Sequence, residues 1–235
     1  MNEIKFNKKG LFIVIDGIDG SGKGTQAKLL VDRLNHDQYS VEIISFPQYG
    51  KKSAGAAEEY LNGMYNKLDP RQSSVLYAVD RFDASGQIRS WLDEGKIVIA
   101  NRYVTANAGH QGGKIQDQKE RAEFFKWLHE LEYGLFNIPV PDLNIIVHMP
   151  AEIAQVLVDK KSAVEREYAG GKKRDIHEAD LDHLKHAEQV FLEIADTFPN
   201  TKLIHSTDSK GELKTPTEVH ESIWSLVTKY LPAKE

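Results

Sequence analysis

A glycine-rich segment near the N-terminus carries the residue types that bind phosphate. Residues 17–25 read GIDGSGKGT and match the pattern G-x-x-x-x-G-K. The glycines allow the backbone to curl so that its N–H groups face an anion, and Lys23 adds a positive charge beside the outer phosphates of a nucleotide. We therefore expect a phosphate-binding loop in which ATP contacts Gly17, Gly20, Ser21, Gly22, Lys23, Gly24 and Thr25.

The residue after the lysine departs from this pattern. Gly24 stands where a hydroxyl that ligates Mg²⁺ is usual, and Thr25 follows one position later. Thr25 is therefore the candidate metal ligand of the loop, and Mg²⁺ bound with ATP is the expected cofactor. The order Gly-Lys-Gly-Thr resembles that of nucleoside monophosphate kinases such as adenylate kinase.

The neighbouring residues predict the elements that hold this loop. Residues 11–15 (LFIVI) form a continuous apolar run that is typical of a buried strand. After Gly24 the apolar residues repeat at helical spacing, at Ala27, Leu30, Val31 and Leu34. A strand, a glycine-rich turn and a helix thus follow one another, as a phosphate-binding loop requires.

Strand-like and helix-like patterns alternate along the rest of the chain. Further strands are predicted at 41–44, 97–100, 143–147 and 203–204, and helices at 71–92, 119–131, 153–158, 179–195 and 217–230. This alternation predicts an α/β fold with one doubly wound, five-stranded parallel sheet and helices on both faces, of the P-loop NTPase type. No linker or repeat divides the chain, so residues 1–235 are expected to form a single domain.

One stretch differs from the rest in composition. Residues 160–174 read KKSAVEREYAGGKKR, with six basic and two acidic side chains around a pair of glycines. Such a stretch predicts a basic lid loop, over about residues 160–176, that closes on bound phosphates.

Composition narrows the classes of function. The 235 residues carry 30 basic and 35 acidic side chains, and the net charge of -5 disfavours binding to nucleic acid or to a membrane surface. The chain has no cysteine, which excludes disulfides, thiolate metal sites and thiol catalysis. No apolar run approaches the roughly 18 residues of a membrane span. We expect a cytoplasmic protein whose partners are small-molecule nucleotides rather than nucleic-acid polymers or membranes.

GTP-dependent switches, ATPases and phosphotransferases all use a phosphate-binding loop. The segments 66–69 (NKLD) and 208–211 (DSKG) match the two guanine-nucleotide patterns, but they stand in the wrong order and context. A motor or transport ATPase usually ends its third strand with an acidic residue, whereas the strand at 97–100 is followed by Asn101. Arg102 and the donor-rich residues after it suit binding of a second anion. A phosphotransferase is therefore favoured, and a non-kinase ATPase is the least favoured class.

Four separated motifs resemble those of thymidylate kinases, which transfer the γ-phosphate of ATP to thymidine monophosphate. They are the phosphate loop, the segment FPQY at 46–49, the segment LYAVDRF at 76–82, and the segment NRY at 101–103. The resemblance covers residues 12 to about 191 and implies an ATP-dependent thymidylate kinase. The alternatives are another nucleoside monophosphate kinase of the adenylate kinase type, or a deoxynucleoside kinase.

The resemblance also implies the residues that bind the acceptor nucleotide. Phe46 or Tyr77 would pack on the thymine, Arg81 and Gln111 would hydrogen-bond its polar groups, and Arg102 would hold the acceptor phosphate. The full expected set is Asp19, Phe46, Tyr77, Arg81, Arg102, Asn107, His110 and Gln111. The chain departs from the family at Asn101, where aspartate is usual, and at His110, where tyrosine or phenylalanine is common.

Catalysis of this reaction needs positive charge rather than a general base, because a phosphate monoester with a second pKa of about 6 is already largely dianionic at neutral pH. Gly20 stands where some relatives carry arginine, so the sequence resembles the subgroup that places its arginine in the lid. The expected catalytic residues are Lys23, Arg102, Asp19, Arg166 and Arg174. The resemblance further implies a homodimer, packed through a helix at about residues 71–92.

Overall fold

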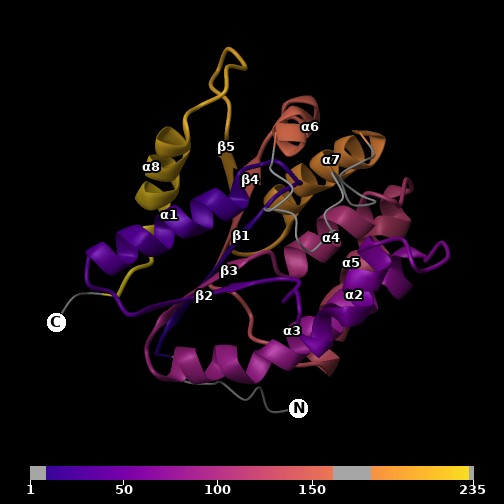
Figure 1. Ribbon diagram of the computed structural model, residues 1–235, viewed down its shortest axis with the longest axis horizontal. Coiled ribbons are helices and arrows are strands. Elements are labelled where there is room, and N and C mark those ends of the chain that lie inside the picture. Colours follow the sequence, from indigo (N-terminus) through magenta and orange to yellow (C-terminus); the bar gives the residue numbers. More distant parts are fainter. Residues whose placement is uncertain (1–8, 161–180, 233–235) are drawn as a thin grey trace.

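The computed structural model describes residues 9–160 and 181–232. Its centre is a five-stranded sheet in the order β2-β3-β1-β4-β5, and every neighbouring pair of strands is parallel (Figure 1). The strands are β1 (Leu11–Asp16), β2 (Val41–Ser45), β3 (Ile97–Asn101), β4 (Leu143–His148) and β5 (Thr201–His205). The doubly wound parallel sheet expected from the sequence is confirmed, including all five strands.

Helices follow the strands along the chain. They are α1 (Lys23–His36), α2 (Gly55–Leu61), α3 (Pro70–Asp93), α4 (Val104–Gly112), α5 (Gln118–His129), α6 (Ala151–Lys160), α7 (Leu181–Thr197) and α8 (Pro216–Val227), with a short 3₁₀ helix at Lys52–Ala54 and a π-helical turn at Glu130–Leu135. Two of them, α2 and α4, were not expected from the sequence. Each of the nine residues of α4 is buried, so the helix presents no alternation of apolar and polar faces.

The two faces of the sheet carry separate apolar cores. Phe12 and Val14 of the central strand pack beneath α3, α4, α5 and α7, whereas Ile13 and Ile15 pack beneath α1 and α8. Figure 1 shows α1 and α8 on one side of the sheet and α4, α5 and α7 on the other. Burial on both faces explains why β1 reads as an unbroken apolar run rather than as an alternating strand.

The two segments that imitate guanine-nucleotide motifs have structural roles. Asp69 is the N-cap of α3, and its carboxylate accepts from the backbone N–H of Gln72 in a reciprocal capping box. Asp208 accepts from the backbone N–H groups of Lys210 and Glu212 in a turn after β5. Their matches to nucleotide-binding patterns therefore arise from a helix cap and a turn.

The carboxyl ends of the parallel strands meet at one edge of the sheet, which is where ligands bind in open α/β folds. The phosphate loop follows β1, Phe46 follows β2, Arg102 follows β3, Met149 follows β4 and Ser206 follows β5. All of these segments line one cavity. None of the described helices is both long enough and apolar enough to cross a membrane.

Candidate active site

One continuous cavity of about 860 Å³ runs along the carboxyl edge of the sheet. At one end it is lined by Lys214, Pro216 and Val219, around the start of α8. The phosphate loop forms its middle, and Tyr77 and Gln111 lie at the other end, on α3 and α4. The space therefore extends to both sides of the phosphate loop.

The phosphate loop has the shape expected of an anion cradle. Gly20 and Gly22 both adopt left-handed backbone conformations, with φ of 83° and 85°, which favour glycine. The residues from Gly20 to Thr25 line the cavity, whereas Gly17 lies at the base of the loop and does not. A side chain on Gly17 would overlap the carbonyl oxygen of Val147. Glycine at this position therefore allows the end of β1 to approach β4 closely.

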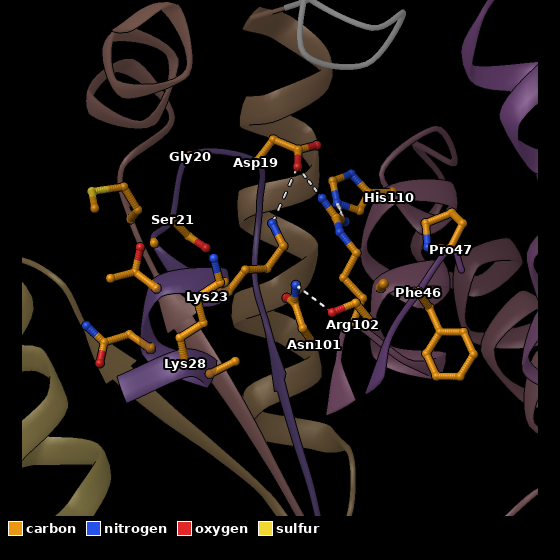
Figure 2. A pocket seen from close by; sticks show the side chains of 18 of the residues that line it. Asp19, Gly20, Ser21, Lys23, Lys28, Phe46, Pro47, Asn101, Arg102 and His110 are labelled. Carbon is orange, nitrogen blue, oxygen red and sulfur yellow. Dashed lines mark hydrogen bonds and ion pairs between the residues drawn. The ribbon is translucent and has the colours of Figure 1, made fainter. Parts of the chain in front are cut away.

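Two cations and one carboxylate meet at the loop (Figure 2). The Nζ of Lys23 lies 3.4 Å from the Oδ1 of Asp19 and donates to the carbonyl oxygen of Ile18 at 3.0 Å. The guanidinium of Arg102 pairs with the same carboxylate and donates to the Nε2 of His110 at 3.0 Å. Arg102 itself has a φ of 68°, a left-handed conformation that is costly for a residue with a side chain and that is often found at functional sites.

Asp16 is a buried carboxyl beside this group that the sequence did not single out. It is fully buried at the end of β1 and accepts from the Oγ1 of Thr105 at 2.8 Å and from the backbone N–H of Gly17 at 2.9 Å. Burial raises the pKa of Asp16, against the opposing effects of Arg102 and Lys23. Asp16 thereby joins the start of the phosphate loop to the start of α4.

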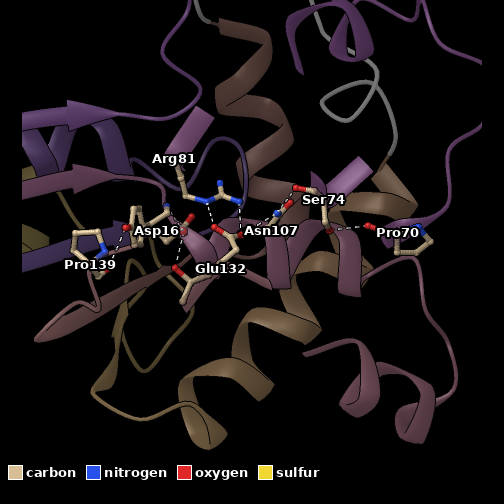
Figure 3. A network of polar contacts seen from close by, with 9 residues as sticks. Asp16, Pro70, Ser74, Arg81, Asn107, Glu132 and Pro139 are labelled. Carbon is tan, nitrogen blue, oxygen red and sulfur yellow. Dashed lines mark hydrogen bonds and ion pairs between the residues drawn. The ribbon is translucent and has the colours of Figure 1, made fainter. Parts of the chain in front are cut away.

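Arg81 is held by a carboxylate rather than standing free in the pocket. Its Nε and Nη2 donate to the two carboxylate oxygens of Glu132, each at 2.6 Å, and both side chains are almost completely buried (Figure 3). Burial alone would lower the pKa of Arg81, but the ion pair with Glu132 raises it. Arg81 also lines the cavity, so the ion pair with Glu132 fixes its side chain at the edge of the ligand space.

Two amide side chains lie one helical turn apart on α4. The Nδ2 of Asn107 donates to the backbone carbonyl of Ser74 at 3.0 Å, and its Oδ1 is buried without a hydrogen-bond partner in the part of the chain that the structure describes. The Oε1 of Gln111 accepts from the Oγ of Ser73 and from the Nζ of Lys114. Both amides line the cavity, so each offers one unused atom to a ligand.

A buried aspartate fixes the segment after β2. Asp80, on α3 beside Arg81, accepts from the backbone N–H of Gln48 at 2.7 Å, from the Nε2 of the same glutamine at 3.0 Å, and from the Oγ of Ser53 at 2.7 Å. These contacts hold the segment that carries Phe46, whose ring packs against Tyr103 in the core and also lines the cavity. Asp80 belongs to the segment 76–82 that resembles the family, but its role was not expected from the sequence, because its partners lie 27 and 32 positions away.

The oxygen donors near the loop suit a hard cation such as Mg²⁺. The Oδ1 of Asn101 is buried, lies at the end of β3 and has no hydrogen-bond partner among the described residues. A side chain on Gly24 would lie 3.6 Å from the Nδ2 of the same asparagine, so Asn101 faces the loop. Thr25 lines the cavity and is exposed. Mg²⁺ prefers oxygen ligands and commonly binds through one or two side chains together with nucleotide phosphates. The residues present therefore fit Mg²⁺.

The cavity brings together every expected acceptor-binding residue and, apart from Gly17, every expected loop residue. Arg166 and Arg174 lie outside the described residues, as does most of the expected lid. Sequence reasoning did not assign a role to four residues of the site: Asp16, Asp80, Lys114 and Glu132. Each of them contacts at least one residue that is distant in the sequence, and no motif announces that contact.

A phosphate loop that faces a second cationic group across a shared cavity, on a parallel sheet of this order, defines a P-loop phosphotransferase. A family model for thymidylate kinase matches residues 15–216. The chain therefore belongs to the thymidylate kinase family, whose reaction is the transfer of the γ-phosphate of ATP to thymidine monophosphate. The enzyme class and function expected from the sequence are confirmed, and the alternative kinases are not favoured.

Individual relatives agree with this assignment. A thymidylate kinase from Mycobacterium tuberculosis is 27% identical over 188 residues, covering 79% of this chain and 86% of the relative. A probable thymidylate kinase from Thermococcus gammatolerans is 25% identical over 227 residues, covering 93% and 96%. The solved structure of a thymidylate kinase from Candida albicans superposes with a TM-score of 0.72 at 21% identity, covering 96% of this chain and 94% of that one. At 21% identity, the similarity to the Candida albicans structure supports the fold alone.

Proposed function

We propose that this chain performs the reaction by holding ATP and thymidine monophosphate at the two ends of the cavity, so that their phosphates meet between Lys23 and Arg102. The observation that carries the proposal is the continuity of the cavity on both sides of the phosphate loop. ATP occupies the side of α8, because α1 begins in the phosphate loop and packs against α8. Thymidine monophosphate occupies the side of α3 and α4.

Positive charge does the catalytic work in this arrangement. Lys23 neutralises charge on the donor phosphates, and Arg102 binds the acceptor phosphate. Because Asp19 pairs with both cations, the incoming phosphates exchange places with its carboxylate. Before the substrates bind, Asp19 keeps the two cations oriented at the point of transfer. The expected contributions of Arg166 and Arg174 remain predictions from the sequence.

The far end of the cavity binds the base. Tyr77 and Phe46 provide aromatic surface, and Arg81, Asn107, His110 and Gln111 provide polar groups. The guanidinium of Arg81 is fixed by Glu132, so it meets the ligand without further loss of side-chain freedom. A flat pyrimidine with two carbonyl groups matches this set of donors.

Mg²⁺ is the proposed cofactor and would be held by the Oδ1 of Asn101, with Thr25 as the further candidate, together with the phosphates of ATP. When bound, Mg²⁺ supplies positive charge at the transferring phosphoryl group.

We also propose that the enzyme is cytoplasmic and forms a homodimer through the outer face of α3. Val79 and Phe82 of that face are 43% and 52% exposed, and the ring of Phe82 lies 5.2 Å from that of Phe136. Sedimentation of Phe82→Glu as a monomer, with the parent chain as a dimer, would support this interface.

A coupled assay of ADP release over all nucleoside monophosphates tests the proposed function. We expect turnover with thymidine monophosphate, and we expect Lys23→Ala to lower kcat by about 10²- to 10³-fold without lowering the melting temperature. The exposed Lys126 of α5 gives the matched control, Lys126→Ala, which keeps its activity. Turnover with AMP alone, or ADP release without an acceptor, would overturn the proposal.

A further inference from the structure

Lys114 lies two residues beyond the end of α4 and is not part of the cavity wall. Its Nζ lies 2.6 Å from the Oε1 of Gln111 and 2.7 Å from the hydroxyl of Tyr60, and it sits over the ring of Tyr60 at 5.3 Å. Burial lowers the pKa of Lys114 to about 8, so the side chain is still mostly an ammonium at neutral pH. An ammonium has three donors and no acceptor.

This contact decides which way the amide of Gln111 points. Because Lys114 can only donate, the atom of Gln111 beside it must be the carbonyl oxygen. The Nε2 of Gln111 has no hydrogen-bond partner among the described residues, and the side chain lines the cavity. Lys114 thus leaves the N–H groups of this amide for a ligand.

Ser73 alone could not make that choice. Its Oγ lies 2.8 Å from the Oε1 of Gln111 and 2.9 Å from the carbonyl oxygen of Asp69, yet a hydroxyl has one proton to donate. If the amide were reversed, Ser73 would donate to Asp69 and accept from the Nε2 of Gln111. Ser73 is therefore compatible with both orientations, whereas Lys114 is compatible with one.

Asn107, one turn earlier on α4, supplies the complementary group. Its Nδ2 is used by the carbonyl oxygen of Ser74, so its Oδ1 is the atom left to accept. Together Asn107 and Gln111 offer one acceptor and one donor, one helical turn apart on α4. Thymine presents an N–H and a neighbouring carbonyl at positions 3 and 4, which match this pair. Cytosine presents an unprotonated nitrogen and an amino group there, which reverse both matches.

We propose that Lys114 is a specificity-determining positioning residue, which fixes the amide of Gln111 so that the site accepts a base with a carbonyl at position 4 and rejects one with an amino group. The inference rests on the proposed binding of thymidine monophosphate at this end of the cavity. Lys114 does not touch the substrate. It acts through Gln111, and its removal frees the amide to reverse toward Ser73.

The test compares kcat/KM for thymidine monophosphate and deoxycytidine monophosphate in Lys114→Met. We expect the ratio of the two values to fall by about 10-fold or more, because the loss for thymidine monophosphate is accompanied by a gain for deoxycytidine monophosphate. The added variant Ser73→Ala/Lys114→Met lacks the acceptor that the reversed amide needs, so part of the ratio should return. Lys119→Met, at an exposed lysine of α5, keeps the parent ratio.

An unchanged ratio in Lys114→Met with a parent-like melting temperature would overturn the inference. An equal fall in kcat/KM for both nucleotides would also overturn it, because it would indicate a structural role alone. Both outcomes are distinct from failure of the proposed function, which would appear in the parent enzyme as absence of turnover with thymidine monophosphate.

Discussion

Asp19 of the phosphate loop is ion-paired with Arg102, which follows β3, and the pair crosses the cavity between the two ends where nucleotides are proposed to bind. The same carboxylate lies 3.4 Å from the Nζ of Lys23. Without substrate, one negative charge thus holds two cations close together. Both cations therefore lie beside the same carboxylate. In this arrangement Arg102 adopts a left-handed backbone conformation, which is energetically unfavourable for a residue with a side chain.

The backbone of Arg102 allows its charge to be removed without loss of stability. In Arg102→Gly the guanidinium is lost, but a residue that favours a φ of 68° takes its place. We expect kcat/KM for thymidine monophosphate to fall by about 10²-fold or more, and the melting temperature to stay level or rise. Arg102→Ala should lose similar activity and be less stable than Arg102→Gly by about 1 kcal/mol. Equal stability of the two variants, measured by urea unfolding, would contradict this account.

The sequence predicted the parts of the molecule that have a local cause. The inner strands β1, β3 and β4 were found because burial on both faces makes them largely apolar runs, and the loop was found because an anion cradle requires glycines and a lysine in order. The helix α4 was missed because burial on all sides removes its periodicity. Glu132 was missed because its role depends on Arg81, 51 positions away. Lys114 was also missed. Its proposed role depends on its contact with the Oε1 of Gln111, and the sequence alone does not show that contact.

The buried ion pair of Arg81 and Glu132 predicts strong coupling between the two residues. Arg81→Ala leaves a buried carboxylate without its partner, so we expect the free energy of unfolding to fall by about 3–5 kcal/mol. Glu132→Ala should have a similar effect, and the double variant should lose clearly less than the sum of the two. Urea unfolding of the three variants and the parent measures this coupling. Additive losses would show that the pair does not act as a unit.

Lys114 should give stability an unusual dependence on pH. Its pKa in the folded protein is about 8, because burial disfavours the charge, whereas the unfolded chain has the ordinary value of 10.5. Between these values the unfolded form binds more protons, so stability rises with pH across this window. We expect this group to contribute about 2 kcal/mol between pH 7.5 and pH 9.5. Unfolding at both pH values should show the gain in the parent chain and in Lys119→Met. A gain of the same size in Lys114→Met would contradict the prediction.

Asn101 offers a neutral oxygen at a place that suits a cation. Asn101→Asp replaces the amide with a carboxylate, which attracts Mg²⁺ more strongly. We expect the concentration of Mg²⁺ that gives half-maximal activity to fall by about 3-fold or more, because even a partly screened charge contributes near 1 kcal/mol. Titration of Mg²⁺ at saturating nucleotides measures the change. Glu42→Asp, at a residue of β2 outside the cavity, provides the control, and an unchanged midpoint in Asn101→Asp would place Mg²⁺ elsewhere.

Gly20 and Gly211 separate backbone strain from packing, because both have a φ of 83°. A side chain on Gly20 would overlap the carbonyl oxygen of Ala154 in α6, whereas one on Gly211 would meet nothing within 4 Å. Gly211→Ala should therefore cost about 1 kcal/mol of stability, from the left-handed backbone alone. Gly20→Ala should cost at least about 2 kcal/mol, because either the loop or α6 must move. The same close approach of Ala154 leaves no room for an arginine side chain at position 20. Urea unfolding measures the loss of stability in the two variants. Equal losses would show that α6 can move away from the phosphate loop at no energetic cost.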